Sequence, residues 1–455
     1  MKRTAFVLTL FTSIALLRAA PPPAGFTALF NGRDLSGWRG GTTFDHRKLL
    51  AMSEAERTAQ IAKWTATMTE VNPATSKAHW HVEGDELVND GKGAYASTLK
   101  DYGNFELRLD YKTVAGADSG IYLRGVPQVQ IWDINQPDQA KRPDRRPRLG
   151  SGGLFNNAAG SPGRDPLVAA DKPFGQWNQV RVVMVGSRVS VWLNEKLVVD
   201  HALMQNFYEQ KLPATERRPV PARGPIQLQT HGGEIRWRNI NLRDIGTDEV
   251  NRILASHGGQ GYQRIFNGKN LDGWAGALES VAVQNGTMVW QKGKAGVPYW
   301  NKELGDFKVR LMVKLPPGGN NGLAIRYPGK GNAAYDGMTE LQILDENYNE
   351  VKKLPPQKQI DSRQYYGSVY GMIAAARGYQ HPIGEWNFEE VTVKGPRIVV
   401  ELNGTVILDG DVSKVDMANV MGRKAHPGKD RPRGYFGFAG HNEPVEFKDV
   451  FIKEL

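Results

Sequence analysis

One sequence pattern occurs twice in this chain, and this repeat limits the fold more than any other feature. FNGRDLSGW at residues 30–38 returns as FNGKNLDGW at residues 266–274. The segment at 175–200, which begins GQWN, matches the segment at 384–409, which begins GEWN, without a gap. A recurrence in the same order indicates two copies of one domain, which suits a chain of 455 residues.

Further matched segments set the expected boundaries. They pair 101–124 with 304–326, 128–133 with 340–345, and 224–245 with 434–455. We therefore expect a signal peptide at 1–20, a first domain at 26–245, a linker at 246–260 and a second domain at 261–455.

The two copies differ mainly in insertions. The first copy carries an extra segment at 41–78, in which Ser53 and Glu56 have the spacing of a capping box and predict a helix. The second copy has a longer stretch at 346–383.

The N-terminus is typical of a secretory signal. Lys2 and Arg3 precede an apolar stretch from Ala5 to Leu17, which is too short to span a bilayer comfortably. We expect a periplasmic or secreted protein that keeps no membrane anchor after cleavage.

Composition excludes several function classes. The chain contains no cysteine, which rules out disulfides, cysteine-ligated zinc and thiol catalysis. The net charge is +10, but the basic runs at 141–148 and 422–433 are rich in proline and lack interleaved aromatic residues. We interpret them as solvated loops and expect no nucleic-acid partner.

The matched segments read as short strands. In FELRLDYK (105–112), apolar and polar residues alternate, as in a strand with one buried face. Asn403 and Gly404 suit a tight hairpin turn between two such strands. The FNGRDLSGW phrase reads as a structural clip, with turns at its Asn-Gly and Ser-Gly pairs. The pattern favours an all-β fold of antiparallel sandwiches with few short helices.

These segments together resemble the 3-keto-disaccharide hydrolase domain family, which is abundant in secreted bacterial proteins. The resemblance rests on FNGRDLSGW, FELRLDYK, ADSGIYLR, QVQIWD, GQWN and the closing QLQTHGGEIRWRNINLRDI, with counterparts in both copies. It implies two tandem concanavalin-A-like jelly-roll sandwiches. It also implies a carbohydrate ligand, an oxidised glycoside or disaccharide with a ketone at C3.

A 3-keto sugar allows cleavage by elimination. The ketone acidifies the C2 proton, a base removes it, the group on C1 leaves, and water adds back. Such a site needs a base near C2, a donor or cation at the C3 oxygen and an acid near the leaving oxygen.

Four side chains of the first copy are candidates for this catalysis. Asp110 is the candidate base or acid, Lys112 and Arg124 would stabilise the enolate oxygen, and His231 would be the second proton carrier. Each has a structural alternative: Asp110 and Lys112 as a surface ion pair, Arg124 as a partner of Asp133, and His231 as a turn residue.

The candidates for substrate binding are polar or aromatic side chains of both copies. They are Asp118, Gln128, Gln130, Trp132, Lys314, Arg326, Glu340, Gln342 and His441.

Each copy lacks one carboxylate that the other holds. Met312 stands where the first copy has Asp110, and Glu340 stands where it has Gln128. If Asp110 is essential, the first copy is catalytic, and if Glu340 is essential, the assignment reverses. The first copy is the preferred candidate.

Other functions stay open at this point. A non-catalytic, lectin-like protein is the main alternative, and a protein-binding module is another. A two-carboxylate glycosidase would need a geometry that sequence does not reveal. HExxH, GxSxG and P-loop patterns are absent, so no metal or other cofactor is predicted, although loop aspartates leave a calcium site open. The oligomeric state is not indicated.

Overall fold

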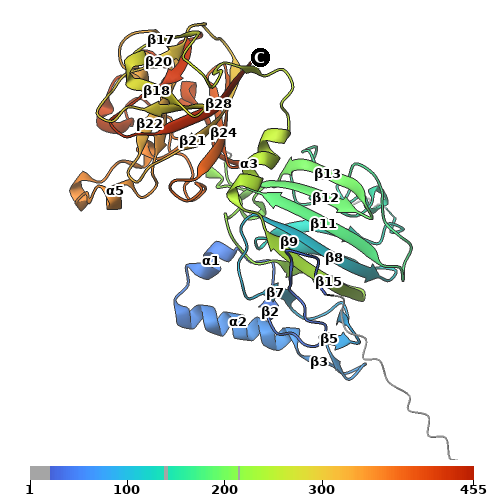
Figure 1. Ribbon diagram of the computed structural model, residues 1–455. Coiled ribbons are helices and arrows are strands. Elements are labelled where there is room, and N and C mark those ends of the chain that lie inside the picture. Colours follow the sequence, from blue (N-terminus) through green and yellow to red (C-terminus); the bar gives the residue numbers. More distant parts are fainter. Residues whose placement is uncertain (1–20, 138–141, 214–215) are drawn as a thin grey trace, which may run out of the picture.

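The computed structural model describes residues 21–137, 142–213 and 216–455. The expected signal peptide at 1–20 lies outside these residues. Figure 1 shows two β-sandwiches, one coloured blue to green and one yellow to red, with helix α3 (Thr247–Ser256) between them. No helix of the described ranges is long and apolar enough to cross a membrane.

The first domain consists of an eight-stranded and a five-stranded sheet. The larger sheet has the order β13-β12-β11-β8-β15-β6-β5, with β1 paired to β15, and the smaller has the order β10-β9-β14-β7-β2. The larger sheet contains β1 (Thr27–Ala28), β5 (Trp80–Glu83), β6 (Glu86–Asn89), β8 (Phe105–Thr113), β11 (Asn178–Val185), β12 (Arg188–Leu193), β13 (Lys196–Leu203) and β15 (Ile235–Asp244). The smaller contains β2 (Trp38–Gly41), β7 (Tyr95–Thr98), β9 (Asp118–Leu123), β10 (Val126–Trp132) and β14 (Gln227–Leu228).

The second domain repeats this topology strand for strand. Its larger sheet has the order β18-β19-β28-β21-β24-β25-β26, with β16 paired to β28, and its smaller sheet the order β17-β20-β27-β22-β23. The larger contains β16 (Gln263–Arg264), β18 (Val281–Gln284), β19 (Thr287–Trp290), β21 (Phe307–Lys314), β24 (Trp386–Lys394), β25 (Arg397–Leu402), β26 (Thr405–Asp411) and β28 (Glu446–Glu454). The smaller contains β17 (Trp274–Gly276), β20 (Pro298–Trp300), β22 (Asn320–Tyr327), β23 (Thr339–Leu344) and β27 (Tyr435–Phe438). The predicted fold class, two tandem jelly-roll sandwiches, is confirmed.

Alternation along the strands separates core from surface. In β8, Phe105, Leu107 and Leu109 are buried in the core between the two sheets. Each such side chain contributes about 1.5–3 kcal/mol by leaving water. The residues between them point to the outer face of the larger sheet. The same rule gives the smaller sheet an outer face, and that face carries the hollows described below.

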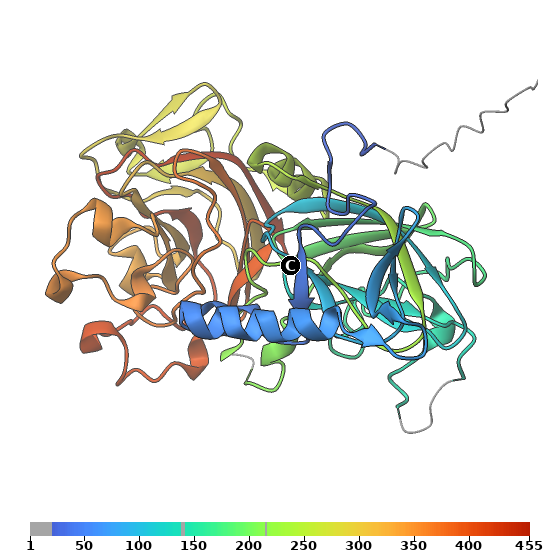
Figure 2. The same cartoon turned by 90° about the horizontal axis from the view of Figure 1, so that it is seen from below.

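The insertion at 41–78 forms helices that cover a sheet edge. It contains α1 (His46–Leu50), α2 (Glu54–Met68) and the short pair β3 (Val71–Asn72) and β4 (Lys77–Ala78). The predicted capping box at the start of α2 is present. Helix α2 runs along the underside of the first domain (Figure 2) and packs on β2, where a Cβ at Gly40 would lie 2.2 Å from the backbone of Trp64. Covering an edge strand in this way prevents it from pairing with other chains.

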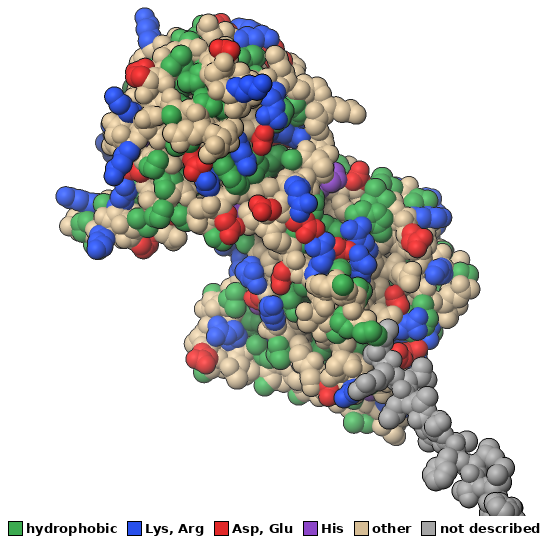
Figure 3. Space-filling model, in the orientation of Figure 1, with side chains coloured by type: hydrophobic (Ala, Val, Ile, Leu, Met, Phe, Trp, Pro, Cys, Tyr) green, Lys and Arg blue, Asp and Glu red, His purple; other side chains and the backbone are tan. Residues whose placement is uncertain are grey.

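The two domains are joined by apolar and polar contacts. An apolar cluster holds Val250 and Leu254 of α3 against strands of both larger sheets. Met312, the counterpart of Asp110, lies in this cluster, which explains why an apolar residue stands there. Arg188 and Glu401 form an ion pair across the junction, with Nε to Oε1 at 2.9 Å. On the face drawn in Figure 3, basic and acidic side chains are interspersed over both domains.

Candidate active site

Five predicted site residues of the first domain come together on its smaller sheet. They line a hollow of about 180 Å³ on the outer face of β9, β10 and the turn after β14: Asp118, Gln128, Gln130, Trp132 and His231. They meet because alternate residues of neighbouring strands point to the same side.

Asp118 lies at the centre of this first hollow. Its carboxylate accepts hydrogen bonds from Gln130 Nε2 at 2.8 Å and from Arg145 Nη2 at 2.5 Å, and it pairs with His231 Nδ1 at 3.1 Å. The bond to Asp118 raises the pKa of His231 above its ordinary value. Sequence analysis missed Arg145, because it belongs to a basic run that reads as a solvated loop.

Asp110 and Lys112 do not reach this hollow. Both lie on β8, which belongs to the larger sheet, and they point to its outer face. Asp110 accepts hydrogen bonds from Asn239 at 2.8 Å and Arg238 at 3.2 Å, and Lys112 pairs with Glu86 at 3.3 Å. Alternation identified the correct face of the strand, but it does not say to which of the two sheets a strand belongs.

Arg124 is not in the hollow either. It is buried, has a positive φ of 53°, and donates to Gly103 O at 2.8 Å, Pro221 O at 3.2 Å and Asn104 Oδ1 at 3.1 Å. Burial lowers its pKa to about 9. The guanidinium therefore satisfies loop oxygens inside the protein, rather than pairing with Asp133 or facing a ligand.

Two predicted site residues of the second domain, Arg326 and Lys314, lie outside the hollow of their domain, as Arg124 and Lys112 do in the first. Arg326 is buried and donates to Gly305 O at 3.0 Å and Asp306 Oδ1 at 2.8 Å. Lys314 lies on β21 of the larger sheet and pairs with Glu446 at 2.8 Å.

The remaining three predicted residues of the second domain share a hollow of about 170 Å³. Glu340, Gln342 and His441 line it on the outer face of the smaller sheet, at the place that corresponds to the first hollow. Several other residues of its lining were not predicted from the sequence, namely Asn332, Tyr335, Tyr348, Gln364 and Tyr370. Most of these come from α4 (Ala333–Asp336), from α5 (Tyr348–Val351) and from the rest of the 346–383 insertion.

Glu340 is the most unusual group of the second hollow. Its side chain is almost fully buried, and its Oε1 atom has no hydrogen-bond partner among the described residues. The carboxyl lies over Gly322, where a Cβ would be 2.2 Å from Oε1. Burial raises the pKa of Glu340 to about 8. A buried carboxyl that is protonated near neutral pH is typical of acid–base catalysts.

His441 lies beside this carboxyl. Its Nε2 atom is 4.0 Å from Glu340 Oε1, and its side chain is 47% exposed. Desolvation lowers the pKa of His441, so that the imidazole is neutral at neutral pH. The hollow therefore contains a protonated acid and a neutral base side by side.

The two hollows keep their amide and histidine but exchange the position of the carboxylate. Gln130 and Gln342 lie opposite Gly120 and Gly322 on the neighbouring strand, and both domains place a histidine after the next strand. Strand β9 of the first domain begins with Asp118, and the corresponding strand β22 of the second domain begins with Asn320. Conversely, Gln128 stands where the second domain has Glu340. Asp118 therefore has Gln130, Arg145 and His231 as partners, whereas Oε1 of Glu340 has no hydrogen-bond partner among the described residues.

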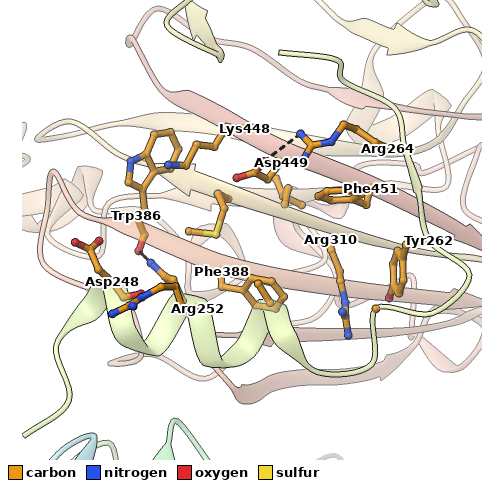
Figure 4. A pocket seen from close by; sticks show the side chains of 15 residues that line it. Asp248, Arg252, Tyr262, Arg264, Arg310, Trp386, Phe388, Lys448, Asp449 and Phe451 are labelled. Carbon is orange, nitrogen blue, oxygen red and sulfur yellow. Dashed lines mark hydrogen bonds and ion pairs between the residues drawn. The ribbon is translucent and has the colours of Figure 1, made fainter.

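A larger hollow lies away from both sites. It has a volume of about 750 Å³ and lies between α3 and the outer face of the second domain's larger sheet (Figure 4). Trp386, Phe388 and Phe451 line it, and its Asp449 pairs with Arg264 at 3.1 Å. It contains none of the predicted site residues.

No group of three or more histidine and acidic side chains in the described ranges is arranged to hold a metal ion.

The chain is similar to several known proteins. A curated relative from Bacteroides thetaiotaomicron, named 3-keto-disaccharide hydrolase, is 24% identical over 250 residues, which cover 47% of this chain and 85% of the relative. A solved structure from Parabacteroides distasonis ATCC 8503, provisionally named a glycosyl hydrolase, is 23% identical with a TM-score of 0.37, covering 43% of this chain and 95% of that one. A carbohydrate-binding module of Bacillus subtilis is 12% identical with a TM-score of 0.25, covering 40% of this chain and 96% of that one.

The family match extends over both domains. The model of the 3-keto-alpha-glucoside-1,2-lyase-like domain matches residues 25–243 and again residues 261–453. The chain therefore belongs to the 3-keto-alpha-glucoside-1,2-lyase-like domain family, in two tandem copies.

Proposed function

We propose that this protein is a hydrolase that cleaves 3-keto-glycosides or 3-keto-disaccharides, and that the second domain performs the reaction. The observation that carries the proposal is the unpaired, buried carboxyl of Glu340, 4.0 Å from His441. The name of the curated relative supports the substrate class. The preference for the first copy depended on Asp110, which lies on the other sheet, so the second copy is now favoured.

The first step is removal of the C2 proton. Neutral His441 is suited to accept it, because its lowered pKa keeps a lone pair free at neutral pH. The electrons of the C2–H bond move toward the ketone and form an enolate at C3. Tyr370 lines the hollow, and since burial raises its pKa, its hydroxyl stays protonated and is able to donate to that oxygen.

The second step breaks the glycosidic bond. The enolate re-forms the ketone, a double bond forms between C1 and C2, and the C1–O bond breaks. Glu340, protonated at neutral pH, gives its proton to the leaving oxygen. Water then adds across the double bond, with its hydroxyl on C1 and a proton on C2, and the net reaction is hydrolysis. Transfer of the proton held by His441 to the neighbouring Glu340 returns both groups to their starting states.

Incubation of the purified protein with a 3-keto disaccharide and with its unoxidised parent tests this function. We expect cleavage of the keto form alone and, in heavy water, deuterium at C2 of the product. If neither sugar is cleaved, the proposal fails and the lectin-like alternative replaces it.

Two variants test the assignment to the second domain. Glu340→Gln keeps the shape of the side chain but removes the acidic proton, and kcat should fall at least about 100-fold. Asp110→Asn is the matched control, because it changes a carboxylate outside both hollows and should leave kcat unchanged. Equal loss in both variants, or in neither, would contradict the assignment.

We also propose that the reaction takes place in the periplasm or outside the cell. This proposal is supported by the secretory-signal pattern of residues 1–20.

A further inference from the structure

The first-domain hollow has the elements of a ligand site but lacks the free acid of its counterpart. Asp118 already accepts from Gln130 and Arg145 and pairs with His231. A carboxylate held by three donors is poorly placed to take a proton from carbon. This hollow is therefore suited to binding rather than to elimination.

Two acceptors of this hollow keep unused hydrogen-bonding capacity, beside the guanidinium groups of Arg142 and Arg145, which also line it. The Oε1 atom of Gln229, a residue that lines the hollow and is only 7% exposed, has no partner among the described residues. The Asp118 carboxylate offers about four acceptor positions and uses three. Acceptors of this kind need donors from a ligand, and the hydroxyl groups of a sugar are such donors.

The remaining lining suits a sugar ring. The rings of Trp132 and Phe155 pack edge to face, with 5.1 Å between their centroids. Together with Phe207 they form the apolar part of the lining. Its volume of about 180 Å³ is well below that of a pocket for a drug-sized ligand and fits a single ring.

From these features we propose that the first domain binds an unoxidised sugar ring, in its hydroxyl form, without cleaving it. A ketone at C3 accepts hydrogen bonds but donates none, so it leaves an acceptor of this hollow unpaired. In the second hollow the Tyr370 hydroxyl is the donor for the C3 oxygen, so a ketone suits that hollow. The first domain thus binds the parent glycan, and the second domain binds its oxidised form. Another enzyme must supply the oxidation at C3.

Binding experiments on the full chain test this inference. We would titrate methyl α-D-glucopyranoside and its 3-keto derivative by saturation-transfer NMR into the Glu340→Gln variant, which under the proposed function consumes the keto sugar at least about 100-fold more slowly. The hydroxyl form should bind saturably, and Asp118→Ala added to that variant should weaken its binding at least about tenfold, as expected for losing one charged hydrogen bond. Asp110→Asn, added in the same way, should leave it unchanged.

A second variant guards against misfolding. His231 has a side chain that is 56% exposed at a turn, so His231→Ala should fold normally and still weaken binding of the hydroxyl form. No saturable binding of the hydroxyl form, or binding that neither variant weakens, overturns the inference. Turnover of the keto disaccharide by the unaltered protein is measured separately. If that turnover is absent, the proposed function fails, but the binding result still tests the inference about the first domain. The inference rests on that function for the choice of glucose as the probe and for the contrast with the second hollow.

Discussion

The raised pKa of Glu340 should be measurable as a dependence of stability on pH. The carboxyl has an ordinary pKa of 4.5, which burial raises to about 8 in the folded protein. At about 1.4 kcal/mol for each pKa unit, this difference corresponds to a change of about 5 kcal/mol in the free energy of unfolding. Glu340→Gln replaces the carboxyl with an amide that does not titrate.

The sign follows from the two protonation states. Below pH 4.5 the carboxyl is protonated in both the folded and the unfolded protein, and its stabilising contribution is complete. Between pH 4.5 and about 8 the unfolded chain releases this proton while the folded protein keeps it, so the free energy of unfolding falls. Above about pH 8 both states are ionised, and the loss levels off at about 5 kcal/mol.

Urea unfolding of the normal protein and of Glu340→Gln at several pH values gives the assay. Hydrogen exchange on peptides from β22 and β23 would assign the transition to the second domain. The difference in free energy of unfolding between the variant and the normal protein should rise by about 5 kcal/mol from pH 4.5 to 8. Glu389, whose pKa burial raises to about 7, contributes equally to both proteins and cancels.

A difference that stays constant over this pH range would refute the reasoning. It would mean that Glu340 is already ionised at neutral pH, and the carboxyl would then have no proton to give to a leaving oxygen.

Three further substitutions test individual contacts. Gly322→Ala places a methyl group 2.2 Å from Oε1 of Glu340 and should lower kcat at least about tenfold in a turnover assay, with thermal unfolding as the check on folding. Arg124→Lys loses the forked donor that reaches three buried oxygens and should destabilise the first domain by about 2–4 kcal/mol in urea unfolding, whereas no change would show that these bonds contribute little. Arg188→Ala leaves Glu401 without its partner across the junction and should raise domain mobility in small-angle X-ray scattering, with an unchanged profile as the contrary result.

Local patterns were readable because neighbouring residues determine them. The FNGRDLSGW phrase forms the expected clip in both copies: Gly32 and Gly37 have positive φ, and the Trp38 indole donates to Leu29 O at 2.8 Å, as Trp274 does to Ile265 O at 2.9 Å. Hydrogen bonds over a few residues and steric limits on φ depend on the local sequence alone.

The candidate site was only partly predictable. Gln130 and His231 meet as expected, since the residues on one strand face and the turn beside it stay close. Asp110 was placed with them wrongly, because its strand joins the other sheet. Tyr370 was missed, since the loop that carries it folds back over the sheet.

The sequence by itself determined the duplication, the all-β class and the faces of the strands, because repeats and period-two alternation are written along the chain. Only the tertiary structure decided which strands share a sheet and which carboxyl is free. Sheet membership depends on pairing between distant segments, and the protonation of Glu340 depends on burial by all the groups around it. The two copies differ in the strand position of one carboxylate, which is Asp118 in the first and Glu340 in the second. The chemical effect of this difference depends on how the strands pack.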